Sequence, residues 1–337
     1  MVYYINVQKI TLNDKNFSYA PVAIFACRRP SKIKNLINSL QQCSESKYTT
    51  LYIFIGGPKN PLDWPKVKEV LEIALTVRGF AEVRVRESYN TLTGANLIKS
   101  GVETVLKDFD RIIVLEDDLE VRSDFLLYMN SALDKYADLK DIAQVSAWNF
   151  GTISSSLPNQ AYLFPVTTSW GWATWKRAWS LKSESTHENF TWLVKKSARI
   201  HKFNYSENYD VLSMIERVLS EGYDAWDAEF YLHCFRNSNL TVFPNSSLVI
   251  NGGFDGSGLN FRNSFPWKTK FEESPQTKFL FPDQIRLSKK YKTYLRYQQD
   301  WVQTFWPTSN FRFFIQKLKR KRRQHLKYYN KGFYGIF

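Results

Sequence analysis

Short apolar runs alternate with amphipathic segments through the first half of the chain. Runs without polar positions are typical of strands that are covered on both faces. They lie at 21–26, 51–55 and 111–115, and one more strand is expected at 142–146. Between them, apolar residues recur every three or four positions, which predicts helices. The first of these helices begins at Ser31, and the others cover 65–78, 93–107 and 123–136. An alternating run at 81–86 predicts a further strand. This alternation predicts an α/β fold with a mostly parallel sheet.

Polar segments follow three of the predicted strands. They are CRRP at 27–30, GGPK at 56–59 and EDD at 116–118. Ligands of open parallel sheets bind beyond the carboxyl ends of the strands. We therefore expect these three segments to lie on one edge of the sheet.

The pattern is weaker after Trp148. We expect helices at 206–221 and 225–236 and short strands at 240–243 and 247–250. A glycine-rich segment, NGGFDGSG, follows at 251–258. Its backbone N–H groups could cradle a phosphate, or it could be a plain surface loop. It does not match the P-loop pattern.

Glu116, Asp117 and Asp118 directly follow an apolar strand. Like charges at this spacing repel one another and raise each other's pKa. A divalent cation removes that cost, and carboxylate oxygens suit Mg²⁺ or Mn²⁺. The alternative is a set of acids near the start of the helix predicted at Ser123.

A second acidic candidate is Asp227, which follows Trp226 in WDAEF. An acid beside a tryptophan in an apolar helix is partly desolvated, and its pKa rises toward the range of a general base. Glu229 competes for the same role. A capping or surface acid is the alternative.

Aromatic and basic residues form two more candidates. Trp170 and Trp172 flank Gly171, and their rings could stack on a sugar or fill the core at the start of a helix. Arg28 and Arg29 follow the first strand, and their donors could hold a diphosphate or a carboxylate, or the pair could simply be solvated.

Composition excludes several classes of protein. Among 337 residues there are three cysteines without a CxxC pair and four scattered histidines, so neither a disulfide scaffold nor a His-based zinc site is supported. No apolar run reaches the ~20 residues that cross a bilayer. The first residues, MVYYINVQKITLND, do not resemble a signal peptide. We therefore expect a cytoplasmic protein.

The net charge of +14 is concentrated at the carboxyl end. Residues 312–337 hold nine Lys and Arg and no acid, mixed with Phe, Leu, Ile and Tyr. This composition favours a segment that contacts anionic lipid at the inner membrane face. Nucleic-acid binding and a solvated tail are the alternatives, and we expect no nucleic-acid partner.

Five segments, in order, resemble a GT-A fold glycosyltransferase. Within that fold, they resemble a bacterial branch that is similar to N-acetylglucosaminyltransferase I and to family 2-like glycosyltransferases. The resemblance covers about residues 20–262. The segments are PVAIFACRRPSKIKNLINSL, RIIVLEDDLEVRSDFLLYMNSAL, SWGWATWKRAW, DAWDAEF and INGGFDGSGLN. The resemblance implies a Rossmann-like, mostly parallel sheet flanked by helices. It also implies a nucleotide-sugar-binding region (1–165), an acceptor and catalytic-base region (166–275) and a C-terminal extension with the basic tail (276–337).

The resemblance assigns the donor site. Asp118 would bind Mn²⁺ or Mg²⁺, which bridges the diphosphate of a nucleotide-sugar. Glu116 and Asp117 would contact the ribose and the sugar, and Arg28 would help to hold the nucleotide. A UDP-sugar is favoured, although Gly56-Gly57 replaces the expected uracil-binding acid.

The resemblance also assigns the acceptor site. Asp227 would be the base of an inverting displacement. Trp170, Gly171, Trp172 and Glu229 would contact the sugar or the acceptor. The acceptor would be a saccharide or a lipid-linked glycan in bacterial cell-surface polysaccharide assembly.

Two other functions are open. A sugar nucleotidyltransferase also uses acids and a metal on an α/β sheet, but it usually has a glycine-rich loop after the first strand, which CRRPSK lacks. A non-catalytic protein that binds membranes or nucleic acid on a transferase fold is the second alternative. It would bind its partner unchanged after Asp118→Ala.

Overall fold

The protein is described here from a computed structural model. The structure describes residues 2–5, 19–58, 60–88, 94–149, 157–180, 185–204, 211–253, 271 and 274–284. The strands are β1 (Val2–Ile5), β2 (Val22–Ala26), β3 (Thr50–Ile55), β4 (Glu82–Glu87), β5 (Arg111–Glu116), β6 (Leu119–Val121), β7 (Ile142–Ser146), β8 (Ala161–Phe164), β9 (Trp172–Trp175), β10 (Leu240–Pro244) and β11 (Val249–Asn251). The helices are α1 (Pro30–Gln41), α2 (Trp64–Leu75), α3 (Gly94–Asp108), α4 (Phe125–Lys135), α5 (Lys176–Trp179), α6 (Thr186–Val194), α7 (Ser197–Phe203), α8 (Val211–Glu221) and α9 (Trp226–Arg236), with short 3-10 turns η1 (Ser46–Tyr48) and η2 (Pro61–Asp63).

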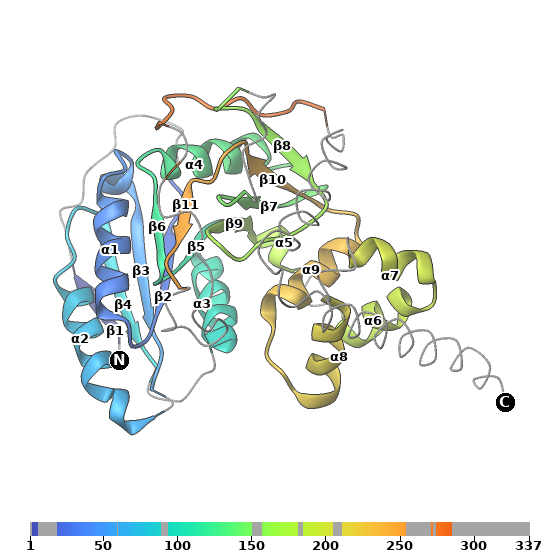
Figure 1. The fold of residues 1–337 in the computed structure, drawn as a ribbon. Coiled ribbons are helices and arrows are strands. Elements are labelled where there is room, and N and C mark those ends of the chain that lie inside the picture. Colours follow the sequence, from blue (N-terminus) through green and yellow to red (C-terminus); the bar gives the residue numbers. More distant parts are fainter. Residues whose placement is uncertain are drawn as a thin grey trace, which may run out of the picture. The chain divides into compact units, whose positions relative to one another are not determined.

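Within these residues, nine strands form one sheet in the order β1-β4-β3-β2-β5-β9-β7-β10-β8 (Figure 1). Strands β4, β3, β2 and β5 are parallel neighbours, as are β7 and β10. The register pairs Ile24 of β2 with Ile53 of β3 and Leu115 of β5. The carboxyl ends of β2, β3 and β5 therefore lie at the same edge of the sheet.

Alternate residues of each central strand belong to separate buried clusters on the two faces. In β2, Val22 and Ile24 pack with side chains of α1, α2 and α4, whereas Ala23 and Phe25 pack with those of α3 and α9. The same alternation holds along β3 and β5. Because both faces are covered, these strands are continuous apolar runs, and the predicted α/β architecture is confirmed.

Strand β9 was not among the predicted elements. It lies between β5 and β7 and is antiparallel to both, so it separates the parallel strands of the sheet. All four of its residues are buried. The strand has only four residues and includes Thr174, so it lacks the longer apolar run that identifies the central strands.

A small two-stranded sheet continues from the carboxyl end of β5. Strands β6 and β11 pair antiparallel, with Leu119 opposite Asn251. Figure 1 shows β11 lying alongside β6. This pairing brings a segment far along the sequence to the acidic turn after β5.

Contacts divide the chain into two units, Met1–Ser183 with Asp224–Ser288, and Glu184–Tyr223 with Lys289–Phe337. In the second unit α6, α7 and α8 pack on one another. The functional divisions predicted at residues 165 and 275 do not coincide with these units and stay a prediction. None of the described helices is long and apolar enough to span a membrane.

A substitution at Gly101 tests how closely α3 packs on the sheet. A Cβ at this position would lie 2.3 Å from the ring of Phe25. Overpacking of this kind costs about 1–3 kcal/mol, which exceeds the roughly 1 kcal/mol that Ala gains over Gly in a helix. We expect Gly101→Ala to lower the denaturant midpoint.

The matched control is Gly94→Ala, because a Cβ at Gly94 has no atom within 4 Å. That variant should be as stable as the parent or slightly more stable. Equal midpoints for both variants would contradict the close contact between α3 and β2.

Candidate functional site

Three acidic side chains lie where β5 ends. Glu116 is the last residue of β5 and lies beside Phe25 in the register. Asp117 and Asp118 form the turn to β6, and the Asp117 N–H donates to the carbonyl of Phe25 at 3.0 Å. The predicted acidic triplet is therefore at the carboxyl edge of the sheet.

Arg29 joins the ends of β2 and β5. One guanidinium nitrogen donates to Oδ2 of Asp118 at 2.7 Å, and another donates to Oδ1 of Asp117. Burial alone would lower the pKa of Arg29, but the two carboxylates outweigh burial and raise it. These contacts confirm the expectation that the segments after the two strands lie on one edge.

The acids remain in excess despite Arg29. Burial raises the pKa of Glu116 to about 8, with further contributions from the charges of Asp118 and Asp117. Burial also raises the pKa of Asp117 to about 6, although Arg29 opposes the shift. The site therefore favours an additional cation or proton near neutral pH.

The first residues of the glycine-rich segment enclose Asp118. The Gly252 N–H donates to the Asp118 carbonyl at 2.7 Å, and Lys32 donates to the Gly252 carbonyl at 2.9 Å. A Cβ on Gly253 would lie 2.3 Å from Oδ2 of Asp118. A side chain at Gly253 would therefore force the Asp118 carboxylate to shift. Residues 254–258 of the segment lie outside the described residues.

Asp227 lies in the first turn of α9, which packs against α3. Burial raises its pKa, and the nearby backbone N–H groups of Asp227 and Ala228 oppose the shift. The charge of Asp227 also raises the pKa of Glu116, so the two acids are close enough to interact across 111 positions of sequence.

Glu229, the competing acid, has a different environment. Its Oε2 lies 2.8 Å from Nζ of Lys99 on α3, and Oδ1 of Asp224 lies 2.9 Å from the same nitrogen. Lys99 thus holds the start of α9 against α3. Because the Glu229 carboxylate is already paired with the Lys99 ammonium, the arrangement favours Asp227 over Glu229 as a base.

The tryptophans around Gly171 differ in burial. Trp172 is 0% exposed, and its ring stacks on that of Trp226 with 4.8 Å between centroids. This position favours the core role for Trp172. Trp170 is half-buried and meets Trp148 edge-on, with 4.6 Å between centroids, so it keeps surface for a ligand.

Gly171 adopts a left-handed conformation, with φ of +65°. A Cβ at this position would lie 2.8 Å from Cγ1 of Val249 in β11. The glycine is therefore explained by its left-handed backbone and by the Val249 side chain packed against it. Contact with a ligand at Gly171 stays a prediction.

The two arginines after β2 separate. Arg28 pairs with Asp63 of η2 at 3.0 Å, whereas Arg29 pairs with the acidic turn. Arg29 was one of the two arginine candidates, whereas Lys32 and Lys99 were not selected as site residues from the sequence. The run of cations that opens α1 was the available signal for Lys32, whereas Lys99 depends on the packing of α3 against α9.

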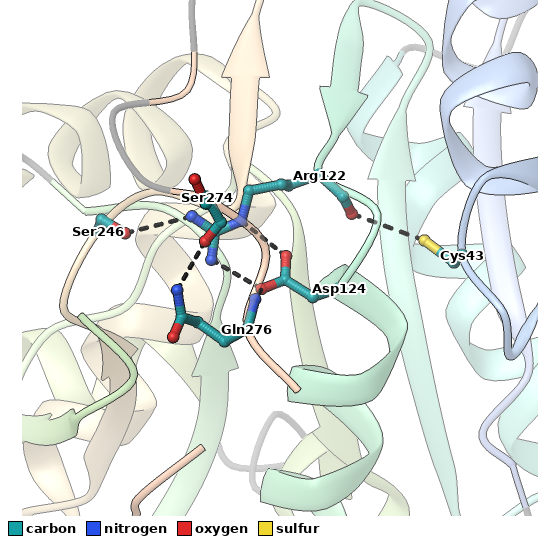
Figure 2. Close-up of polar contacts among 6 residues, drawn as sticks. All are labelled: Cys43, Arg122, Asp124, Ser246, Ser274 and Gln276. Atoms are coloured by element: carbon teal, nitrogen blue, oxygen red, sulfur yellow. Dashed lines mark hydrogen bonds and ion pairs between the residues drawn. The ribbon is translucent and has the colours of Figure 1, made fainter. Parts of the chain in front are cut away.

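A buried ion pair anchors the chain beyond the acidic turn (Figure 2). Arg122 Nε donates to Oδ1 of Asp124 at 2.6 Å, and both side chains are less than 5% exposed. Asp124 also accepts from the Gln276 N–H at 2.7 Å, and the Arg122 carbonyl lies 3.6 Å from Sγ of Cys43. These contacts hold the chain just after β6 against Cys43, which follows α1, and against the segment at 274–276.

The donor set fits a divalent cation that takes part of its coordination from a ligand. No described residues form a group of three or more His, Cys, Asp or Glu arranged around a common metal position. Mg²⁺ sites commonly use one or two carboxylates together with substrate phosphates and water. Asp118 supplies hard oxygen, and Gly252 and Gly253 place no side chain against its carboxylate.

No protein-family model matches the chain. Among solved structures, it is similar to a mannosyltransferase from Pyrobaculum calidifontis in complex with GDP-Man and Mn²⁺, with 11% identity and a TM-score of 0.35 over 66% of this chain and 70% of that chain. It is similar to S. aureus TarS, with 11% identity and a TM-score of 0.40 over 68% of this chain and 36% of that chain. It is also similar to 4-diphosphocytidyl-2C-methyl-D-erythritol synthase from Anaerococcus prevotii, with 10% identity and a TM-score of 0.34 over 67% and 87%. At such values the likeness assigns neither a family nor a substrate to this chain.

Proposed function

We propose that the protein is a metal-dependent glycosyltransferase of the GT-A type, which moves a sugar from a nucleotide-sugar to a hydroxyl group. The observation that carries this proposal is the electrostatic interaction between two sets of acids, one of which lies at the carboxyl edge of the sheet. The Glu116–Asp118 turn comes from β5 and Asp227 comes from α9, and their charges interact. One set can hold the leaving diphosphate, and the other can activate a nucleophile.

On the donor side, Asp118 is the proposed ligand of Mn²⁺ or Mg²⁺. A divalent cation there would offset the charge that develops on the departing diphosphate. Glu116 and Asp117 would bind hydroxyl groups of the ribose and the sugar. Arg28 and Arg29 lie at the same edge as donors for phosphate oxygens. A UDP-sugar is the favoured donor.

On the acceptor side, Asp227 is the proposed general base. It would take the proton of an acceptor hydroxyl as that oxygen forms a bond to the anomeric carbon. The bond to the nucleoside diphosphate breaks, and its electron pair leaves with the diphosphate. Attack from the opposite face inverts the configuration. Trp170, with its partly exposed ring, is the proposed wall for the sugar or acceptor.

A donor screen tests this function. Purified full-length protein is incubated with UDP-, GDP-, dTDP- and CMP-sugars, in Mn²⁺ or in EDTA, and free nucleotide is measured. We expect release from one donor, in Mn²⁺ and not in EDTA. Pyrophosphate release from a nucleoside triphosphate and a sugar phosphate would instead support the nucleotidyltransferase. If the protein neither releases nucleotide from any donor nor binds any donor in a metal-dependent way, the result would contradict a transferase site.

We further propose that the acceptor is lipid-linked, in bacterial cell-surface polysaccharide assembly at the inner face of the membrane. The support is the composition of residues 312–337, which lie outside the described residues. Each cation near an anionic surface contributes about 1 kcal/mol, so nine together would dominate binding.

Deleting residues 312–337 should abolish flotation with phosphatidylglycerol vesicles. The full chain should float with these vesicles and not with phosphatidylcholine alone. Flotation that is unchanged by the deletion would contradict a membrane role for the tail. Retention of the full chain on an oligonucleotide column at the same salt concentration would favour nucleic acid instead.

A further inference from the structure

The backbone of Arg29 is held at the start of α1, and its side chain extends from there to the acids. It caps α1, and its carbonyl accepts from the N–H groups of Lys32 and Ile33, both at 3.1 Å. Its side chain is 18% exposed and forks to Asp117 and Asp118. The guanidinium is therefore held between the two carboxylates by a rigid helix start rather than by a loop.

The guanidinium donates a hydrogen bond to an oxygen of Asp118, the proposed metal ligand. It contacts Oδ2 of Asp118, the atom that also faces Gly253. A divalent cation at this carboxylate would lie within a few ångströms of a fixed positive charge, and the repulsion is strong in a partly buried site. The affinity of this oxygen for the cation is therefore lower while Arg29 is bound to it.

We propose that Arg29 is a built-in counter-ion that competes with the divalent cation for Asp118 when no donor is bound. The inference rests on the proposed function, in which Asp118 binds the metal. It goes beyond that function by assigning Arg29 control over metal loading.

The same geometry indicates how the competition ends. A guanidinium forms bidentate hydrogen bonds to phosphate as well as to carboxylate. A nucleoside diphosphate at the carboxyl edge would draw Arg29 from Asp118, which leaves the carboxylate to the cation. Metal and diphosphate would then bind cooperatively, and each would raise the affinity of the other by the same factor.

Direct titration with Mn²⁺ tests the competition, with free Mn²⁺ measured by electron paramagnetic resonance and no nucleotide present. We expect Arg29→Met to bind Mn²⁺ at least about tenfold more tightly than the parent protein. The matched control is Arg28→Met, which removes the same charge from the adjacent position, where the partner is Asp63. This control should stay within about twofold of the parent.

Adding Asp118→Asn to Arg29→Met should remove the gain in affinity. The proposal is overturned if Arg29→Met and Arg28→Met bind Mn²⁺ equally, or if tight binding survives the loss of Asp118. Should Arg29→Met fail to fold, Arg29→Lys replaces it, because a single ammonium cannot fork to both carboxylates. We expect about threefold tighter Mn²⁺ binding for this variant, and affinity equal to the parent's would overturn the proposal.

The titration contains no sugar donor, so it is independent of the donor screen. Tighter Mn²⁺ binding by Arg29→Met together with an inactive donor screen would support the counter-ion and contradict the transferase. Donor turnover together with equal Mn²⁺ affinities of Arg29→Met and Arg28→Met would support the transferase and contradict the counter-ion.

Discussion

Asp118→Asn should reduce metal-dependent release of nucleotide from the donor by about a thousandfold or more. A metal at a leaving diphosphate contributes several kcal/mol in the transition state, and ~4 kcal/mol corresponds to about three powers of ten in rate. An amide has the shape of the carboxylate but lacks the charge that holds the cation. The measurement is the initial rate of release at saturating Mn²⁺, with the donor that the screen identifies.

The fold should tolerate this substitution, because it removes one charge from an excess of acids. The matched control is Asp134→Asn. Asp134 pairs with Arg111 at the amino end of β5, away from the acidic turn. This variant should release nucleotide at the parent rate. Release by Asp118→Asn within about tenfold of the parent would show that Asp118 is not the metal ligand.

The sequence was sufficient to predict the central strands and the edge on which the site lies. The runs expected at 21–26 and 111–115 are β2 (Val22–Ala26) and β5 (Arg111–Glu116). Both are buried on two faces, so continuous apolar residues identify them. Once the strands are parallel, their carboxyl ends share an edge, and the acidic turn has to lie beside the segment after β2.

The choice between Arg28 and Arg29 depends on information that a linear pattern does not contain. Adjacent residues in a loop point in different directions, and the start of α1 at Pro30 determines which of the two arginines faces β5. The pairing of Lys99 with Glu229 likewise needs α3 and α9 to be packed together. The environments that separate Asp227 from Glu229 were therefore visible only in the structure.

The core role of Trp172 was one of the two alternatives that its sequence left open. Burial between β5 and β7 decides in favour of the core, because the antiparallel strand β9 is held on both sides. Trp170, two residues earlier, precedes the strand and is half-buried. A short motif therefore contains residues with different roles, and only the strand boundary separates them.

Asp227→Asn should lower kcat by about 10²–10⁴-fold, the usual contribution of a general base. The pKa of Asp227 is raised by burial, so kcat of the parent should increase with pH through a midpoint above 3.8, the ordinary value of an aspartate. The variant should lack this acidic limb. Glu229→Gln identifies the base by comparison, since a greater loss there, together with loss of the limb, would reassign the base to Glu229.

Stability should change in the opposite direction to activity. Because the pKa of Asp227 is higher in the folded than in the unfolded state, folding favours the protonated form. Its stabilising contribution is present below the unfolded pKa and is lost as the pH rises through the folded pKa. Asp227→Asn removes a buried charge at pH 8, so its Tm there should equal or exceed that of the parent, and the difference should shrink at pH 5. A variant with a lower Tm at pH 8 would indicate that Asp227 supports the fold, and its loss of kcat could not then be assigned to proton transfer.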